Sequence, residues 1–221
     1  MSIGFIQVSS IAFGQNLNWA NWKQDQRHII NLNAGLDYSV SYGLGYGYKF
    51  KKQWPALLTA EYSQPSGNKL IDDFKTKLGV QLDVYNIGPL HLVAKAFGIF
   101  RRYENDYVSI LNFGSDLSAT VGYFKPRWFG AADVGFDKAI ATHFKHSALF
   151  REHFSNVKNG WYEPATGGNF YYGLNAGLSI KQSDIYLKVG KVISQDFKTK
   201  LMLPFYVQLG FSYKFTTPSK G

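Results

Sequence analysis

The sequence predicts an all-β chain that closes into an antiparallel transmembrane β-barrel of about ten strands, within a range of eight to twelve. Three observations predict it: hydrophobicity that alternates with a period of two, a polar face made of small residues, and connectors that alternate between short and long. Aromatic residues form 17% of the 221 residues and charged residues 18%, which suits many strands and few surface helices. Since the chain has no cysteine, disulfides and thiolate metal sites are excluded.

The first segment, residues 1–14, is expected to be the remnant of a signal peptide. Its uncharged apolar stretch ends with Ala12 and Gly14 at the minus-three and minus-one positions before Gln15, as at a secretory cleavage site, although a basic n-region is missing. A true first strand is the alternative. Export would leave a mature chain with a periplasmic segment at 15–28, a barrel at 29–215 and a polar tail at 216–221.

Residues 30–50 show the strictest alternation. Every even position, from Ile30 to Phe50, is apolar or aromatic, and every odd position is polar, charged or glycine. An even strand count, usual in bacterial single-chain barrels, favours a hairpin here over one long strand. A three-residue turn near Asp37 would keep the alternation in phase, because paired residues share a face.

The same alternation recurs at 74–84, 172–180 and 203–215. A soluble antiparallel sheet also alternates, but its exposed face favours Lys, Glu and Thr. Here the polar face is rich in Gly, Ser and Asn, which suit a crowded, hydrated interior, so the large residues are expected to face lipid. Such a sheet must close, because hydrocarbon cannot satisfy an open edge.

Connectors and aromatic residues support this topology. Short turns are predicted at 86–89, 124–126 and 182–184, and longer outer connectors at 63–70, 101–106, 138–169 and 195–200. Aromatic girdles are expected at both membrane interfaces. The periplasmic girdle comprises Tyr48, Phe50, Trp54, Tyr123, Trp128, Tyr213 and Phe215, and the outer one Tyr62, Phe74, Phe100, Phe136 and Tyr172.

With its signal-like start, alternating strands and aromatic last strand ending in "FSYKF", the chain resembles the small outer-membrane β-barrel proteins of Gram-negative bacteria over residues 29–215. No subfamily is assigned. The resemblance implies location in the bacterial outer membrane, contact with membrane lipid, and insertion by the barrel assembly machinery, which reads such terminal strands. In this chain a polar tail follows Phe215.

Charged residues on the inward face are predicted to form an ion-pair and hydrogen-bond network that mostly fills the lumen. A narrow channel for small anionic solutes is the alternative, because Lys is in excess. The network residues are Glu61, Lys75, Lys77, Asp83, His91, Lys95, Arg127, Asp133, Asp137 and Lys188, with Asp73, Lys181 and Lys214 beside them.

The long connector 138–169 is expected to be partly helical, since residues 142–154 place Phe144, Leu149 and Phe150 near one face. It is predicted to cap the barrel or to form a platform for a partner, made of His143, His146, Arg151, His153, Trp161 and Tyr162. No zinc motif accompanies the histidines, so no metal and no cofactor are predicted. A rim hydrolase using Asp137, His143 and Ser147 is a further alternative, without a supporting motif.

Basic residues of the outer connectors, Arg101, Arg102, Lys198 and Lys200, are candidates for contacts with lipopolysaccharide phosphates; a solvated rim is the alternative. The net charge of +9 comes without nucleic-acid motifs, so nucleic acid is not expected. We therefore predict a non-enzymatic envelope barrel whose outer loops bind a surface partner or ligand. The rival classes are a channel, a rim hydrolase and a soluble ligand-binding barrel with its aliphatic face turned inward.

Overall fold

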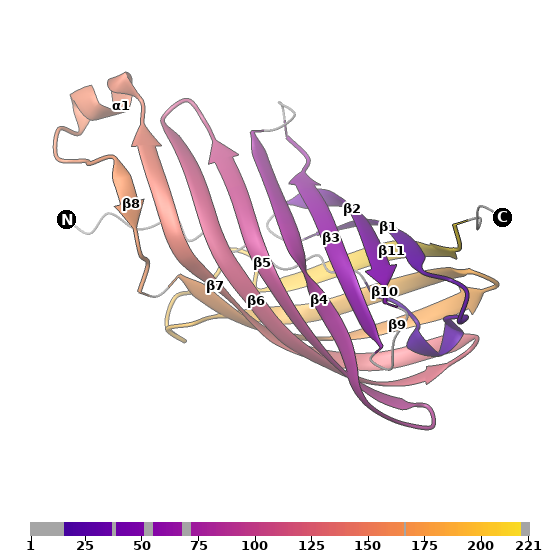
Figure 1. The fold of residues 1–221 in the computed structure, drawn as a ribbon. Coiled ribbons are helices and arrows are strands. Elements are labelled where there is room, and N and C mark those ends of the chain that lie inside the picture. Colours follow the sequence, from indigo (N-terminus) through magenta and orange to yellow (C-terminus); the bar gives the residue numbers. More distant parts are fainter. Residues whose placement is uncertain (1–15, 37–38, 51–54, 68–71, 166, 218–221) are drawn as a thin grey trace.

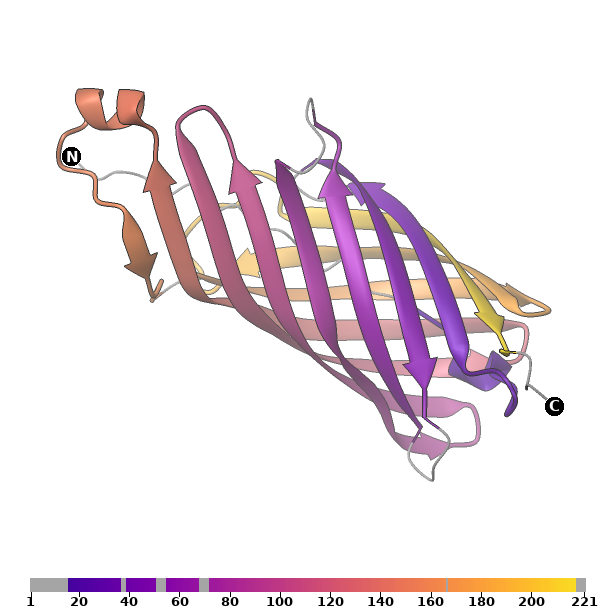
Figure 2. The same ribbon diagram turned by 45° about the horizontal axis from the view of Figure 1, so that its top comes forward.

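The fold is a closed antiparallel barrel of ten strands, seen in a computed structural model that describes residues 16–36, 39–50, 55–67, 72–165 and 167–217. Each strand pairs with its neighbours in sequence, and pairing of the first strand with the last closes the ring (Figures 1 and 2). The ring contains β1 (His28–Leu36), β2 (Val40–Lys49), β3 (Ala56–Pro65), β4 (Asp73–Ile87), β5 (Leu90–Glu104), β6 (Val108–Lys125), β7 (Trp128–His146), β9 (Gly168–Ile180), β10 (Ser183–Ser194) and β11 (Phe205–Phe215).

Three short elements lie outside the ring. The 3-10 helix η1 (Trp19–Asn21) precedes β1, and the helix α1 (Ala148–His153) and the strand β8 (Gly160–Tyr162) lie between β7 and β9. Of the strands that the structure describes, β8 pairs with β7 alone. Among the described residues, no helix has the length and apolarity needed to cross a membrane.

The first hairpin confirms the interpretation of residues 30–50. Strands β1 and β2 pair from His28 with Tyr48 to Leu36 with Val40. Three residues, 37–39, therefore connect them, as the in-phase alternation required. With this hairpin the ring reaches the predicted count of ten.

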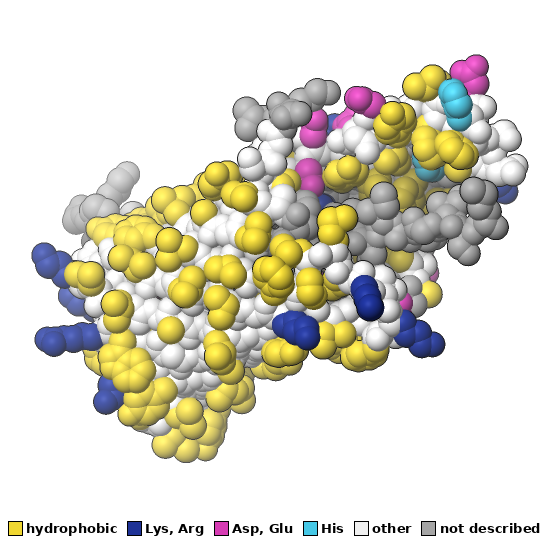
Figure 3. Space-filling view, turned by 180° about the vertical axis from the view of Figure 1, so that it is seen from behind, with side chains coloured by type: hydrophobic (Ala, Val, Ile, Leu, Met, Phe, Trp, Pro, Cys, Tyr) yellow, Lys and Arg dark blue, Asp and Glu magenta, His cyan; other side chains and the backbone are white. Residues whose placement is uncertain are grey.

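The two faces of the barrel are inverted relative to a soluble protein. Along β11, Ser212 and Lys214 are completely buried, whereas Leu209 and Tyr213 are exposed on the outside. Leu174 on β9 leaves 63% of its surface exposed, and Figure 3 shows hydrophobic side chains over the outer wall. Large aliphatic residues in contact with water would be unfavourable, so the soluble-barrel alternative is wrong.

Connector lengths alternate as predicted. At one end, two-residue turns at 88–89, 126–127 and 181–182 join the strands; at the other lie longer connectors at 66–72, 105–107, 147–167 and 195–204. We call these the periplasmic and the outer end. The expected helix at 142–154 is wrong in its first half, because residues 142–146 continue β7 and pair with β6. Only Ala148–His153 is helical, and its start is fixed by Ser147, whose Oγ accepts from Phe150 N at 3.2 Å.

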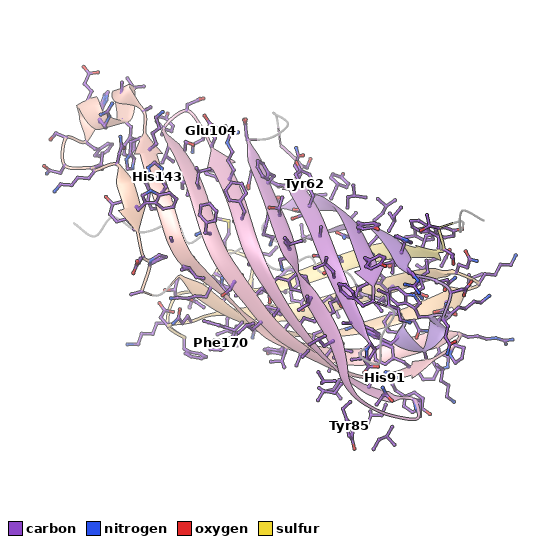
Figure 4. The ribbon with its side chains drawn as sticks, viewed as in Figure 1. Tyr62, Tyr85, His91, Glu104, His143 and Phe170 are labelled. Atoms are coloured by element: carbon purple, nitrogen blue, oxygen red, sulfur yellow. The ribbon has the colours of Figure 1, made fainter. Side chains whose placement is uncertain are left out.

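Aromatic side chains follow the outer end around the wall. Ring centroids of Tyr62 and Phe74 are 5.8 Å apart, those of Phe74 and Phe100 are 5.9 Å apart, and those of Phe100 and Phe113 are 5.1 Å apart. In Figure 4, Tyr62 lies towards the outer end, and Tyr85 projects from the wall at the periplasmic end. Predicted girdle residue Trp54 lies outside the described residues.

Candidate functional site

The periplasmic mouth of the lumen is occupied by the chain itself. Residues 16–26, which precede β1, run through the mouth, with η1 at the end where Figures 1 and 2 show the C-terminus. Leu17, Trp19 and Trp22 are buried. They pack in one apolar cluster with inward side chains of the wall: Ile29, Leu57, Val93, Phe124, Phe129, Ala131 and Tyr186. We call residues 16–26 the N-terminal plug.

Polar contacts fix the plug to the last strands of the barrel. Asn18 is fully buried, and its backbone N donates to Asp184 Oδ2 at 3.0 Å. Its side-chain Nδ2 donates to Ser179 Oγ at 2.9 Å and to the carbonyl of Lys125 at 2.6 Å. Ser212 Oγ on β11 donates to the carbonyl of Asn16 at 3.1 Å. Because buried polar groups need partners, these contacts fit the plug to one position.

A buried ion pair of the wall lies beside the plug. Lys214 Nζ is 2.6 Å from Asp184 Oδ2, and neither side chain has any exposed surface. Lys214 also donates to the carbonyls of Asn18 and Asn21 at 3.4 and 3.3 Å, and its Nζ lies 5.9 Å from the ring centroid of Trp22. The pair therefore connects two neighbouring strands with the plug.

Above the plug, the lumen contains a cavity of about 10 Å³ lined by Asn16, Leu17, Trp19, Gln81, Lys95, Thr120, Phe124 and Asn175. That volume holds roughly one water molecule. No ion larger than water fits there without moving side chains.

The middle of the lumen holds two charged clusters, one around Asp133 and one around Asp116. Asp133 lies 3.4 Å from Lys188 Nζ and 3.8 Å from Lys95 Nζ, and it also accepts from Thr120 and Asn175. Asp116 lies 2.6 Å from Lys77 Nζ and accepts from Tyr171 Oη at 2.7 Å. Asp116 and Tyr171 were not among the predicted network residues, although both lie at inward positions of their strands.

Other predicted network residues lie at the two ends of the lumen. Near the periplasmic end, His91 Nδ1 is 2.8 Å from Asp83 Oδ2, and Figure 4 places His91 there. Towards the outer end, Asp137 accepts from Asn169 N at 3.0 Å and Lys75 is buried. Glu61 is partly buried on β3.

Three assignments of basic residues need correction. Arg127 and Lys181 were expected in the lumen, but both occupy two-residue turns and are exposed, because turn residues leave the alternation of the strands. Arg101 was expected on an outer connector, but β5 continues to Glu104, so Arg101 faces inward, is buried and pairs with Asp73 at 3.0 Å.

The outer end carries an aromatic projection that we call the outer blade: residues 107–112, 142–146, α1 and β8. Figure 1 shows it standing beyond the rest of the rim. Trp161 packs against His143 at a centroid distance of 5.0 Å and against Phe113 at 5.9 Å. Further ring contacts link Phe144 with Tyr162 and His146, and Phe150 with His146, Tyr107 and Phe154.

The predicted platform residues all belong to this blade, but the proposed hydrolytic set is not assembled. A bulge at Ile140 reverses the parity of β7. As a result Asp137 lies in the lumen, whereas His143 lies against Trp161 and Ser147 caps α1. Arg151 and His153 are exposed on α1, and Lys198 and Lys200 are exposed on the connector 195–204. Arg102 pairs with Glu104 at the rim.

Comparisons with known proteins return structures of outer-membrane barrels. No family model and no curated protein sequence matches the chain. The solved KdgM porin is 10% identical, with a TM-score of 0.44, over 85% of this chain and 99% of that one. The N-terminal β-barrel domain of Pseudomonas aeruginosa OprF is 10% identical (TM-score 0.32; 87% and 98% covered), and Yersinia pestis Ail is 14% identical (TM-score 0.33; 86% and 99% covered).

The membrane assignment rests on the geometry itself. The ring closes without an open edge, its strand number is even, its outer wall is apolar and its interior is charged. A lipid bilayer requires a closed ring and an apolar outer wall, and bacterial single-chain barrels show all four features. The chain is a β-barrel protein of the bacterial outer membrane, without an assigned subfamily.

Proposed function

We propose that this barrel binds a partner at the cell surface through its outer blade. The observation that carries the proposal is an aromatic surface that is exposed although its backbone is fixed. Trp161 leaves 60% of its surface exposed, and Tyr107, Leu149, Phe154 and Tyr162 are exposed beside it. Contiguous exposed apolar patches on a soluble surface mark sites of interaction.

The backbone of the blade is held by regular pairing and by caps. Strand β8 adds to the edge of β7 through pairs such as His143 with Trp161. His146 N donates to Asn159 Oδ1 at 2.8 Å, which ties the end of β7 to the segment before β8. A binding surface that is already ordered loses little conformational entropy when a partner binds.

The blade begins at the aromatic girdle, where Trp161 packs against Phe113, and extends beyond it. Strand β6 begins at Val108, five residues before the girdle residue Phe113, so it rises about 16 Å along its own direction beyond that girdle, at roughly 3.3 Å per residue. Aromatic anchors of this kind dominate interface energies, and truncation of one typically costs about 2 kcal/mol or more.

Site-specific photo-crosslinking in growing cells tests the proposal. A photoreactive amino acid at Leu149 is expected to form a discrete protein or glycan adduct, and the same amino acid at lipid-facing Leu187 only lipid adducts. Substitution of Phe154 and Tyr107 by Ser should reduce the Leu149 adduct at least tenfold. Absence of any Leu149 adduct, or an adduct insensitive to these substitutions, would refute the proposal.

The same proposal includes contacts with lipopolysaccharide. Lys198 and Lys200 are exposed on the connector 195–204, and neither forms an ion pair with another described residue. Ammonium groups here fit phosphates through charge-assisted hydrogen bonds. Insertion by the barrel assembly machinery stays a prediction of the sequence resemblance.

A further inference from the structure

The periplasmic end of the barrel carries an excess of basic side chains that the proposed function does not use. The exposed and half-exposed cations here are Lys23, Arg27, Lys49, Lys125, Arg127 and Lys181, whereas Asp25 is the exposed acid among the described residues of this end. Figure 3 shows Lys and Arg side chains at the left end of the molecule with no acidic side chain in view there.

Three of these cations lie together on neighbouring turns. Lys125 ends β6, Arg127 is in the turn to β7, and Lys181 is in the turn from β9 to β10. The two turns are adjacent because β7 pairs with β9, and Ser179 N donates to the carbonyl of Arg127 at 2.8 Å. None of the three forms an ion pair with a described residue. We call them the basic turn cluster.

The cluster lies at the level of the membrane interface. Lys125 is the register partner of Trp128, and its Nζ is 5.5 Å from the ring centroid of Tyr123. Tyr123 and Trp128 are girdle residues on the lipid side, 40% and 43% exposed, with centroids 5.6 Å apart. Two-residue turns extend only about 7 Å past the girdle, at roughly 3.3 Å per residue, which is the depth of lipid headgroups.

The plug holds both turns in place. Asn18 Nδ2 donates to the carbonyl of Lys125 at 2.6 Å, and Asn21 Nδ2 donates to the carbonyl of Lys181 at 3.1 Å. Lys181 has a positive φ of 56°. In the equivalent turn between β4 and β5, the residue with a positive φ, 58°, is a glycine, Gly88. A lysine at such a position is strained where glycine would not be, so the turn keeps a cation at some cost in stability.

We propose that the basic turn cluster binds the headgroup phosphate of anionic phospholipids in the periplasmic leaflet. The cations supply charge-assisted hydrogen bonds to phosphate, and Tyr123 and Trp128 supply the amphipathic surface that borders a headgroup. An acidic periplasmic protein fits less well, because the cations lie at the girdle and not on a surface that projects into the periplasm. The inference is independent of the outer blade.

Titration of phosphatidylglycerol into phosphatidylcholine nanodiscs that contain the intact protein tests this, with retained lipids counted by native mass spectrometry. Wild type is expected to retain phosphatidylglycerol preferentially. The variant Lys125→Gln/Arg127→Gln/Lys181→Asn should bind it about a hundredfold more weakly, roughly fivefold per cation, since each Lys or Arg near an anionic surface contributes about 1 kcal/mol. Asn tolerates positive φ, so Lys181→Asn alone should lose about fivefold while the barrel keeps its heat-modifiable migration.

The control removes two cations of the outer half that neither proposal uses, Lys158→Gln/Lys191→Gln, and should leave this preference unchanged. An equal loss in both variants would show a bulk charge effect and overturn the proposal. Unchanged preference in the periplasmic variant would also overturn it. If soluble glycerol phosphate competes as well as the lipid does, the ligand is a free phosphate and the lipid assignment is wrong.

Discussion

Replacement of Asp184 by Asn removes the negative charge from the fully buried ion pair that Asp184 forms with Lys214 beside the plug. Asp184 accepts from Lys214 Nζ at 2.6 Å, from Asn18 N at 3.0 Å and from Ser179 Oγ at 2.7 Å. In Asp184→Asn the ammonium of Lys214 stays buried without a counter-charge. Breaking a buried pair from one side costs about 3 to 5 kcal/mol, so the free energy of unfolding should fall by that amount.

Urea unfolding in phospholipid vesicles, followed by tryptophan fluorescence, measures this loss. The matched control is Glu104→Gln, which breaks the pair with Arg102, whose side chains are 39% and 41% exposed. An exposed pair contributes about 0 to 1 kcal/mol. The double variant Asp184→Leu/Lys214→Met removes both charges and should recover most of the loss, because an apolar replacement of a whole pair is often neutral.

Equal small losses in Asp184→Asn and Glu104→Gln, both below about 1 kcal/mol, would refute the reasoning. Such a result would mean that water reaches Lys214 and that residues 16–26 do not seal the mouth. A large loss in the double variant as well would show that packing, and not charge, determines stability at this position.

Three further predictions follow from the interior and the outer loops. Gly210→Val should lower the free energy of unfolding by about 1 to 3 kcal/mol, because a Cβ at Gly210 would meet the buried ring of Tyr186. The control Gly130→Val should be neutral, because a Cβ at Gly130 meets no atom within 4 Å. Equal effects of the two substitutions would contradict close packing around Gly210. Purified wild type should give no steady current in a planar bilayer, since buried ion pairs and the plug occupy the described part of the lumen; a reproducible single-channel conductance would contradict this. In the connector 195–204, donation from the Thr199 hydroxyl and from the Thr199 and Lys198 amides lowers the pKa of Asp196. The ionised Asp196 carboxylate therefore stabilises this connector fully above the unfolded-state pKa of about 3.9, and the stabilisation is lost as the pH falls through the lower folded pKa. Protection of the Lys198 amide in hydrogen exchange should therefore persist below pH ~3.9. A loss of protection with its midpoint at or above pH ~3.9 would contradict this.

The wall of the barrel was predictable because the alternation of apolar and polar residues can be seen within each strand. A lipid-facing strand repeats every two residues, so the alternation at 30–50, together with an even strand count for the whole barrel, predicted a hairpin and the parity of its turn. The inward positions of Lys77, Lys95, Asp133 and Lys188 follow from the same alternation. Trp161 and Tyr162 were expected in the long outer connector, and they lie on β8 in the segment between β7 and β9.

Errors arose where the alternation is interrupted. Parity counted through a two-residue turn placed Arg127 inside, and a loop boundary drawn too early placed Arg101 outside. The bulge at Ile140 shifts His143 to the opposite face from Asp137. Bulges are set by packing between strands, which one sequence does not display.

The plug was not predictable from local pattern. Its residues do not alternate, and its partners are distant in sequence, since Asn18 and Asp184 are 166 positions apart. The one signal was chemical: Trp19 and Trp22 lie in a short polar stretch just before the first strand. Two bulky aromatic residues without a lipid-facing period indicate burial by some other surface, but they do not say which.

The contacts of the plug also set an order of events during biogenesis. Residues 16–26 emerge from the ribosome before any strand, yet Ser179, Asp184, Ser212 and Lys214, which hold them, belong to the last three strands to be made. That set of partners comes together only when β10 has paired with both β9 and β11. The stretch around Trp19, which is buried in the finished barrel, should therefore stay open to periplasmic proteases until these last strands have paired, so that its protection dates this late step of assembly.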